Sequence, residues 1–430
     1  MKISIIGCGY VGLVTGTCFA QLGNQVLCID NDLKKINKLK KNILPIYEPG
    51  LEELLKINVK KKRLSFSSHI REAVEKTEII FIAVGTPSRA DGQPDLTGIE
   101  NVATQIAKNL KEYRLIVEKS TVPVETGEWV KHTVKINNYF GTDFDVASNP
   151  EFLREGTAIS DFMQPDRIVI GVDSERAKKL LLKLYQPIKA PILITDIKSA
   201  ELIKHASNSF LATKISFINA ISQICERTGA DVIKVAEGMG LDRRIGKDFL
   251  KAGIGYGGAC LPKDLDAFIS IAEKVGYDFQ LLKIVKQINE EQKDFIIKKL
   301  SDALWIMEGK TLGVLGLTFK SNTDDIRNSV ALNIIRKLQK EKAIIKAYDP
   351  KGIPAAKKIF KNKIKFCLNP YEVAKGTDAL LILAEWREFR DLDFKKIKKL
   401  MHQPLIVDGR NIFEPAVLKE MGFRYIGVGR

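Results

Sequence analysis

The sequence predicts an α/β protein in which two Rossmann-like doubly wound domains are joined by a long helical connector. Short β-branched runs alternate with helical segments over residues 1–195 and again over residues 310–430, as in parallel sheets with crossover helices. Residues 196–309 instead show long helical patterns. A chain of 430 residues is also too long to fold around one ordinary hydrophobic core. We therefore expect three domains with these boundaries.

Each sheet domain contains several β-branched runs that we expect to be strands. In the first domain they are Lys2–Ile6, Gln25–Ile29, Ile79–Val84, Leu115–Glu118, Phe144–Ser148 and Ile168–Gly171. Amphipathic stretches such as Val11–Leu22 and Asp32–Lys41 separate them and are expected to be crossover helices of a parallel sheet. In the third domain the runs are Thr311–Gly316, Ile344–Tyr348, Ala379–Ala384 and Leu405–Val407.

The connector is expected to hold one helix over residues 199–228 and a second helical stretch, with breaks, over residues 262–306. A glycine-rich loop lies between them. Long apolar helices between two sheet domains are suited to pairing with a second copy of the chain, so we expect a homodimer.

Composition argues against several classes of protein. No apolar stretch is long enough to span a membrane, and the first strand begins at once, which leaves no room for a signal peptide. We therefore expect a cytoplasmic protein. The net charge of +16 comes largely from lysine runs, and no nucleic-acid-binding motif accompanies them. We expect attraction to a phosphorylated small substrate rather than a nucleic-acid partner.

The cysteines and histidines form no recognisable metal or disulfide pattern. The six cysteines include no CxxC pair, and the four histidines are scattered along the chain. We expect reduced thiols and no structural metal.

A GxGxxG motif at residues 7–12 (GCGYVG) follows the first strand and opens the first helix. Such a loop lets the backbone approach a pyrophosphate at a helix N-terminus. Asp30 ends the next strand, about 20 residues further on, where a carboxylate binds ribose hydroxyls and repels the extra phosphate of NADP. The pattern predicts a dinucleotide site that favours NAD, although Lys35 could accommodate a phosphate. A sheet that binds FAD or another nucleotide is the alternative.

The most informative motif is GIGYGGACLPKD at residues 253–264. Cys260 ends the glycine-rich loop where a helix is expected to begin, because Pro262 suits the first helical position. The helix dipole and Lys263 would both favour a thiolate there. A buried structural cysteine is the alternative, but the crowded glycines and the adjacent Lys263 and Asp264 have no packing rationale. The motif therefore predicts a nucleophile in a substrate-binding loop.

Three weaker signals leave two interpretations open. Lys204 and Asn208 share a helix face and could stabilise an oxyanion, or simply face solvent. Thr86 and Thr121 follow two strands and could bind cofactor or substrate, or only shape turns. Residues 313–329 combine glycines, a lysine and an arginine before a helix, which suits an anion site or a plain connection.

Together these motifs resemble the UDP-glucose 6-dehydrogenase family, within the wider UDP-glucose/GDP-mannose dehydrogenases. The matching motifs are GCGYVG, VGTP, KSTVP, NPEFLREG (residues 149–156), the Lys204 and Asn208 helix, GIGYGGACLPKD and GLTFKSNTDDIRNS. They occur in the family's order and cover essentially the whole chain. The resemblance implies that a sugar 6-hydroxyl is oxidised twice with two NAD, through a cysteine thiohemiacetal and a thioester that water hydrolyses.

The resemblance also implies a role for each matching residue. Catalysis is expected from Cys260, Lys204, Asn208, Asp264, Thr121 and Glu151. Cofactor contacts are expected from Gly7, Gly9, Val11, Gly12, Asp30, Lys35, Thr86, Thr121, Glu155, Lys263 and Arg327. Substrate contacts are expected from Phe152, Leu153, Arg154, Glu155, Lys204, Asn208, Arg244, Phe249, Leu250, Lys251, Ala252, Gly253, Gly257 and Lys320. Among these, Arg244 would reach the substrate of a neighbouring subunit.

The chain departs from the family pattern at three positions. Ala259 and Leu261 flank the cysteine where serine and phenylalanine are frequent, and Asn328 stands where an acidic residue is common. Leucine at that position also occurs in relatives that use GDP-mannose or UDP-N-acetylmannosamine, so the same reaction on those sugars is the alternative to UDP-glucose. A two-electron hydroxyacid dehydrogenase would need neither the cysteine loop nor a third domain.

Overall fold

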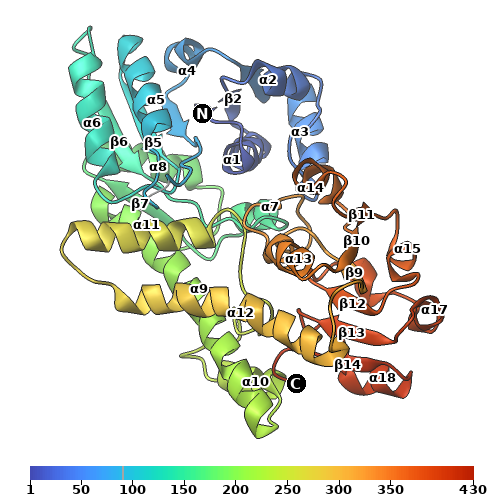
Figure 1. The fold of residues 1–430 in the computed structure, drawn as a ribbon. Helices are drawn as coiled ribbons and strands as arrows, with labels where there is room; N and C mark the ends of the chain where they lie inside the picture. Colours follow the sequence, from blue (N-terminus) through green and yellow to red (C-terminus); the bar gives the residue numbers. More distant parts are fainter. Residues whose placement is uncertain (90–91) are drawn as a thin grey trace. The chain divides into compact units, whose positions relative to one another are not determined.

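The computed structural model describes residues 1–89 and 92–430, which form two compact units (Figure 1). Unit 1 comprises Met1–Ser207 and Asp266–Gly276, and unit 2 comprises Asn208–Leu265 and Tyr277–Arg430. Two helices, α9 and α11, begin in one unit and end in the other. The predicted division into domains at residues 195 and 309 stays a prediction.

Within the described residues, unit 1 is built on an eight-stranded sheet in the order β3-β2-β1-β4-β5-β6-β7-β8. The strands are β1 Lys2–Ile6, β2 Gln25–Ile29, β3 Leu64–Ser67, β4 Ile79–Ile82, β5 Arg114–Glu118, β6 Phe144–Ser148, β7 Ile168–Val172 and β8 Ile192–Thr195. All six predicted strands are present, and β3 and β8 were not expected.

The pairing of β6 with β7 is antiparallel, whereas the other neighbouring strands of this sheet are parallel. The expectation of a wholly parallel sheet is therefore wrong at this pair. The connection between the two strands holds only the six-residue helix α7 (Ala158–Met163) and not a full crossover helix, so the chain turns back along the sheet.

Helices cover both faces of the unit 1 sheet. One apolar core takes side chains from α1 Tyr10–Gln21, α2 Leu33–Lys40, α3 Leu51–Lys60, α7 and α8 Glu175–Tyr185. A second core on the other face takes side chains from α4 Ile70–Lys76, α5 Thr97–Lys108 and α6 Thr126–Asn137. This two-sided packing is the doubly wound arrangement.

Unit 2 contains a six-stranded parallel sheet in the order β11-β10-β9-β12-β13-β14, formed within residues that are all described. The strands are β9 Thr311–Leu315, β10 Ile344–Tyr348, β11 Lys365–Phe366, β12 Ala379–Ile382, β13 Leu405–Asp408 and β14 Arg424–Ile426. The helices that follow β9 are α13 Val330–Lys340, α14 Ile353–Phe360, α15 Pro370–Ala374, α16 Arg387–Arg390, α17 Phe394–Leu400 and α18 Pro415–Glu420. The strand order is that of a Rossmann fold, so the predicted fold class is confirmed.

Long helices separate the two sheets in the sequence, as predicted. They are α9 Ile197–Thr228, α10 Val232–Gly240, α11 Leu261–Lys274 and α12 Gln280–Leu304. The helix expected over residues 199–228 is thus present, and the break expected within residues 262–306 lies between α11 and α12.

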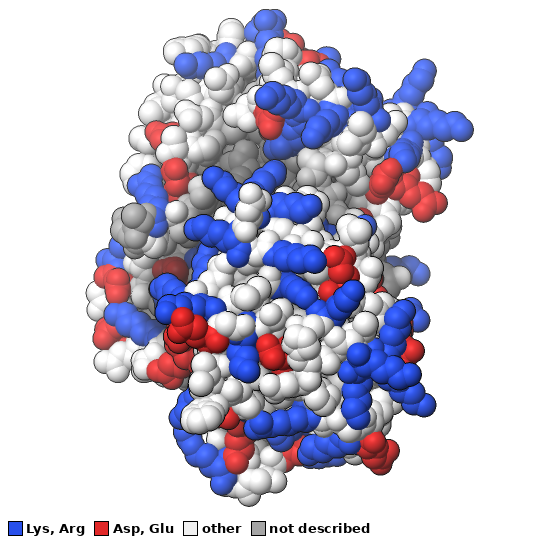
Figure 2. Space-filling view, turned by 45° about the vertical axis from the view of Figure 1, so that its right-hand side comes forward, with Lys and Arg blue, Asp and Glu red and all other residues white. Residues whose placement is uncertain are grey.

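The described part of the chain contains no helix that is long and apolar enough to cross a membrane. It also contains no group of three or more His, Cys, Asp or Glu residues placed to hold a metal ion. On the face shown in Figure 2, Lys and Arg side chains are numerous and Asp and Glu side chains lie among them.

Candidate active site

The loop between β1 and α1 requires glycine for steric reasons. Gly7 has a φ of +108°, which other residues rarely adopt, and a Cβ there would collide with the carbonyl group of Ala83. A Cβ at Gly12 would overlap the carbonyl oxygen of Gly7. Gly9 is the N-cap of α1, half-buried Val11 is in its first turn, and no described side chain caps this helix end. An N-terminus of this kind suits a phosphate group.

Asp30 lies directly after β2, which pairs with β1 in the sheet. Its carboxylate accepts hydrogen bonds from the Cys8 amide at 2.8 Å and the Asp32 amide at 3.0 Å. Lys35 Nζ lies 2.7 Å from Asp30 Oδ2. Lys35 is therefore paired with Asp30, and the carboxylate stands where an adenosine ribose is expected.

The KSTVP loop at residues 119–123 is held by a set of short contacts. The Thr86 hydroxyl donates to the Thr121 carbonyl at 3.0 Å, so Thr86 has a role in shaping this loop. The Ser120 amide donates to Glu118 Oε1 at 2.9 Å, and His205 Nε2 lies 2.7 Å from the Val122 carbonyl oxygen. These contacts fix half-buried Thr121 at the carboxyl end of β5.

Glu151 and Lys204 form a buried ion pair. Lys204 Nζ lies 3.2 Å from Glu151 Oε1, and both side chains are 5% exposed. Lys204 Nζ also lies 5.3 Å from the centre of the Phe152 ring, and the Arg167 guanidinium lies 3.9 Å from the same ring. A solvent-facing Lys204 is thus ruled out, and the structure brings Glu151, Phe152 and Lys204 together.

The segment after Glu151 lines a cavity of about 100 Å³, together with residues that include Lys119, Arg167 and Tyr185. The Leu153 amide donates to Glu151 Oε2 at 2.5 Å, and Arg154 is bound to Asp161, with NH2 2.6 Å from Oδ1. Glu155 follows and is half-buried. The Arg154 guanidinium is therefore already engaged within unit 1.

Glu48 holds the end of this segment, and no sequence motif marks it as part of the site. Its buried carboxylate accepts hydrogen bonds from the Gly156 amide at 2.6 Å and the Ala158 amide at 2.8 Å. The Tyr10 hydroxyl lies 3.0 Å from the Gly156 amide. Side chains of α1 and the loop before α3 thus fix the residues that follow Glu155.

In unit 2, Cys260 is exposed and immediately precedes α11. Its carbonyl accepts a hydrogen bond of 2.8 Å from the Asp264 amide, which makes Cys260 the N-cap residue of the helix. The helix begins at Leu261. Pro262 therefore occupies the second helical position, whereas the prediction placed it at the first. The thiol therefore lies at a helix N-terminus, where the dipole favours a thiolate.

Asp264 is a buried carboxylate with two polar partners from the predicted site. Asn208 Nδ2 donates to Asp264 Oδ2 at 2.6 Å, and Lys263 Nζ lies 2.6 Å from Asp264 Oδ1. Asn208 is 8% exposed and Asp264 is 1% exposed. The solvent-facing interpretation of Asn208 is therefore also wrong.

The cysteine loop rests on buried polar residues that the sequence analysis did not identify. Three of them, Asn219, Asn289 and Gln292, bind the backbone of Gly253 and Tyr256 at 2.8–3.1 Å. An amide side chain inside an apolar helical pattern was the only available signal, and it is a weak one.

Arg410 supports the same loop from the end of β13. NH1 donates to the Gly255 carbonyl at 3.2 Å, NH2 to the Phe319 carbonyl at 3.0 Å and Nε to the Leu383 carbonyl at 3.0 Å. Burial lowers the pKa of Arg410 below its ordinary value. One guanidinium thus joins the cysteine loop to the two loops that follow the carboxyl ends of β9 and β12.

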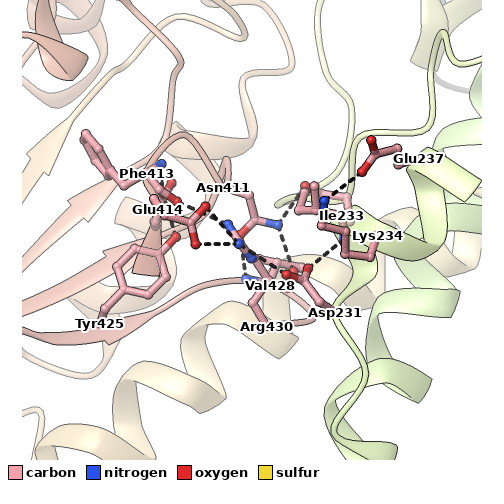
Figure 3. Close-up of polar contacts among 12 residues, drawn as sticks. Asp231, Ile233, Lys234, Glu237, Asn411, Phe413, Glu414, Tyr425, Val428 and Arg430 are labelled. Carbon is pink, nitrogen blue, oxygen red and sulfur yellow. Dashed lines mark hydrogen bonds and ion pairs between the residues drawn. The ribbon is translucent and has the colours of Figure 1, made fainter. Parts of the chain in front are cut away.

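Asn411 extends this support to the segment that follows β14 (Figure 3). Its side chain exchanges hydrogen bonds of 2.8 and 2.9 Å with the backbone of Val428. Arg430 NH2 lies 3.2 Å from both Asp231 and Glu414, and so ties the same segment to the start of α10. These contacts stiffen the platform under the cysteine loop.

The remaining predicted residues of unit 2 lie in separate settings. Gly257 packs against the Asn328 carbonyl, and Asn328 Nδ2 donates to the Gly258 carbonyl at 3.1 Å. The guanidinium groups of Arg327 and Arg244 are bound to Asp325 and Asp242. The other members are Phe249, which has a φ of +64°, buried Leu250, Ala252 and Gly253, exposed Lys251 and half-buried Lys320. Arg244 is 89% exposed and touches no other predicted residue within its unit.

Three family models match successive parts of this chain. They are described as the NAD binding domain, the central domain and the UDP binding domain of the UDP-glucose/GDP-mannose dehydrogenase family, and they match residues 1–189, 198–291 and 313–415.

Full-length relatives are similar to the chain from end to end. The UDP-glucose 6-dehydrogenase TuaD of Bacillus subtilis (strain 168) is 49% identical over 100% of this chain and 93% of its own length. The UDP-glucose 6-dehydrogenase of Rhizobium meliloti (strain 1021) is 46% identical over 100% of both chains.

Solved structures agree with these sequence matches. A UDP-glucose dehydrogenase from Pyrobaculum islandicum has a TM-score of 0.93 and 38% identity over 100% of this chain and 97% of that chain. A UDP-D-ManNAc dehydrogenase from Pyrococcus horikoshii has a TM-score of 0.88 and 30% identity over 100% of this chain and 99% of that chain.

Proposed function

Because this chain belongs to the UDP-glucose/GDP-mannose dehydrogenase family, we propose that it oxidises UDP-glucose to UDP-glucuronate with reduction of two NAD per sugar. The observation that carries the proposal is the placement of Cys260, an exposed thiol at the N-terminus of α11 on a braced glycine loop. A two-electron alcohol dehydrogenase has no use for such a nucleophile, whereas a reaction that continues to the acid does.

The residues of unit 1 fit NAD. The Gly7–Gly12 loop and the first turn of α1, which includes Val11, suit the pyrophosphate. Asp30 accepts hydrogen bonds from ribose hydroxyls, and its pairing with Lys35 offsets the positive charge that a 2′-phosphate would need. Thr86, Thr121 and Glu155 complete the proposed contacts in unit 1, and Lys263 and Arg327 do so from unit 2. NAD, when bound, accepts the hydride from the sugar carbon.

The sugar carbon changes in four steps. The first oxidation removes a proton from the 6-hydroxyl and a hydride from C6, which leaves an aldehyde. The Cys260 thiolate then adds to the aldehyde carbon to give a thiohemiacetal. Loss of a second hydride and the hydroxyl proton gives a thioester, and attack by water releases the carboxylate and restores the thiol. Covalent capture keeps the aldehyde bound between the two oxidations.

Charged and amide groups would stabilise these steps. Lys204 supplies a positive charge for the developing oxyanion, and Glu151 holds that lysine in place. Asn208 positions the sugar and Asp264, and Asp264 orders the hydrolytic water near Cys260. Thr121 lies in a loop fixed by Thr86 and orients the reacting hydroxyl.

Substrate binding is assigned by motif to two segments. In unit 1 these are Phe152, Leu153, Arg154 and Glu155. In unit 2 they are Phe249, Leu250, Lys251, Ala252, Gly253, Gly257 and Lys320, with Arg244 directed to a second subunit. The substitution at Asn328 supports the site, because its amide binds the Gly258 carbonyl of the cysteine loop.

UDP-glucose is favoured over the related sugars by similarity. The relatives between 41% and 49% identical are named UDP-glucose 6-dehydrogenases. The UDP-D-ManNAc dehydrogenase from Pyrococcus horikoshii reaches 30%. Leu261 is therefore weaker evidence for another sugar than the similarity of the whole chain is for UDP-glucose.

A homodimer in the cytoplasm is also part of the proposal. Phe210, Phe217 and Ile224 lie seven residues apart on α9 and are 64%, 49% and 52% exposed, which gives one apolar stripe for a second copy. Arg244, mostly exposed, would reach across such an interface. A reducing compartment suits a reaction that depends on the Cys260 thiol.

The test mixes protein, NAD and limiting UDP-glucose, and counts NADH per sugar consumed. GDP-mannose and UDP-N-acetylmannosamine are run in parallel. Two NADH per UDP-glucose, with UDP-glucuronate as product, is the expected result. One NADH per sugar, or turnover of another sugar alone, would contradict the proposal.

A further inference from the structure

Lys119 is a buried lysine close to the Glu151–Lys204 pair, and the proposed reaction gives it no role. It directly follows β5, lines the same cavity as Glu151 and is 5% exposed. Its Nζ lies 2.9 Å from Asn149 Oδ1 and 3.3 Å from the Tyr185 hydroxyl. Both acceptors are neutral, and within the described residues the structure gives this amine no carboxylate partner.

The amine is part of a closed network that fixes Asn149. The Tyr185 hydroxyl donates to Asn149 Oδ1 at 2.5 Å, and Asn149 Nδ2 donates to the Val169 carbonyl at 2.7 Å. The Asn149 amide donates to the Glu118 carbonyl at 2.9 Å. Asn149 lies two residues before Glu151, so this network sets where the segment that carries Glu151 begins.

The charge on Lys119 matters because two lysines compete for one carboxylate. Glu151, which is paired with Lys204, attracts Lys119, while Lys204 repels it. Burial outweighs this attraction and lowers the pKa of Lys119 to about 7. Tyr185, whose pKa burial raises above its ordinary value, stays neutral beside it. The other charged residues that line the cavity are Arg154, Asp161, Asp166 and Arg167.

We propose that Lys119 is a positioning residue: a buried, uncharged amine that fixes Asn149 and leaves Glu151 with Lys204 as its single cationic partner. A second positive charge at this position would favour the neutral form of Lys204 and so weaken its hold on an oxyanion. The catalytic part of this inference rests on the proposed function, whereas the charge state does not.

The charge state is tested by stability, without turnover. A lysine that stays neutral in the folded protein binds fewer protons than the same lysine in the unfolded chain between about pH 7 and 10. Wild-type stability therefore gains from rising pH across this window, and Lys119→Met lacks that gain. We expect the melting temperature of Lys119→Met, relative to wild type, to be highest at pH 7 and to decline towards pH 10. A difference that does not vary with pH would overturn the proposal.

Matched variants separate charge from packing. Lys119→Gln keeps a donor for Asn149 and should show the same pH-dependent difference, so the result does not depend on one variant folding. Tyr185→Phe removes a hydrogen bond from the same network but no titrating amine within this pH range. Its melting temperature should therefore shift by the same amount from pH 7 to about pH 9, below the range in which an unfolded tyrosine ionises.

Activity tests the consequence for Lys204. Lys119→Arg places a permanent charge beside the pair, so the loss of kcat/KM on raising pH should begin about one pH unit lower or more. Lys119→Met should leave that midpoint in place, because the wild-type amine is already neutral there. A midpoint that moves upward in Lys119→Met would overturn the proposal. If wild type yields no UDP-glucuronate, the proposed function fails while the stability result still stands.

Discussion

Asn208 on α9 donates a 2.6 Å hydrogen bond to Asp264 on α11, whose carboxylate is 1% exposed. The other carboxylate oxygen is bound by Lys263 at 2.6 Å. The acid proposed to order the hydrolytic water is thus itself fixed from two sides, four residues after the thiol. The orientation of Asp264 therefore depends on α9. A substitution at Asn208 should change the position of Asp264 relative to Cys260.

Asn208→Ala should lower both stability and turnover. It removes a donor from a buried carboxylate, which costs about 1–3 kcal/mol in unfolding free energy. Chemical denaturation and kcat measure the two effects. Asn208→Asp is the matched variant, because it places a second carboxylate against Asp264 and should be more harmful than alanine. Wild-type stability in both variants would show that the hydrogen bond is unimportant.

Cys260→Ala should abolish formation of the acid, by about 10³-fold or more, because the aldehyde can no longer be captured. Cys260 is exposed, so the variant should fold normally and bind NAD as wild type does. Product analysis by chromatography and NAD titration by fluorescence make the comparison. UDP-glucuronate formed at a near-normal rate would refute the covalent scheme.

Asp30→Ala should weaken the preference for NAD over NADP by roughly tenfold or more, because a carboxylate near a phosphate is unfavourable. The substitution also releases Lys35 from its 2.7 Å ion pair, so the lysine can meet the 2′-phosphate. The ratio of kcat/KM for the two cofactors measures the change. The double variant with Lys35→Ala should lose the gain for NADP, and an unchanged ratio in the single variant would contradict the assignment of Asp30.

Much of the site could be predicted because it is local in sequence. The Gly7–Gly12 loop, Asp30 and the Cys260 loop each follow a recognisable strand or precede a helix, and parallel strands bring their carboxyl ends to one edge. The strand pattern likewise predicted both sheets. Strands β3 and β14 have only four and three residues, too few for a pattern that predicts a strand.

The supporting residues that could not be predicted have hydrogen-bond partners far away in the sequence. Arg410 contacts Gly255 across 155 positions, and Gln292 contacts Gly253 across 39. Each is a polar residue whose partner is a backbone carbonyl, which no side-chain pattern marks. The antiparallel β6–β7 pair depends in the same way on the path of the chain and not on either strand's composition.

Phe217→Glu should convert a dimer to a monomer. Phe217 is 49% exposed at the middle of the apolar stripe on α9, and a buried unpaired carboxylate would oppose the interface. Sedimentation velocity measures the molecular mass. Trp129→Glu on α6 is the control, because Trp129 is 65% exposed on another helix and should leave the mass unchanged. A monomer mass for the wild-type protein would contradict the proposed dimer.

Glu118→Gln should stabilise the protein at alkaline pH and have little effect in acid. Glu118 is 1% exposed, its Oε2 has no hydrogen-bond partner among the described residues, and burial raises its pKa to about 8. The folded state therefore holds a proton that the unfolded chain loses near pH 4–5, so wild-type stability falls as pH rises towards 8. Glutamine keeps an acceptor for the Ser120 amide but cannot ionise. The melting-temperature difference between variant and wild type should grow from pH 5 to pH 9, whereas a constant difference would mean that Glu118 is ionised throughout. Buried Glu201, whose own pKa burial raises to about 7, adds to the rise in the pKa of Glu118.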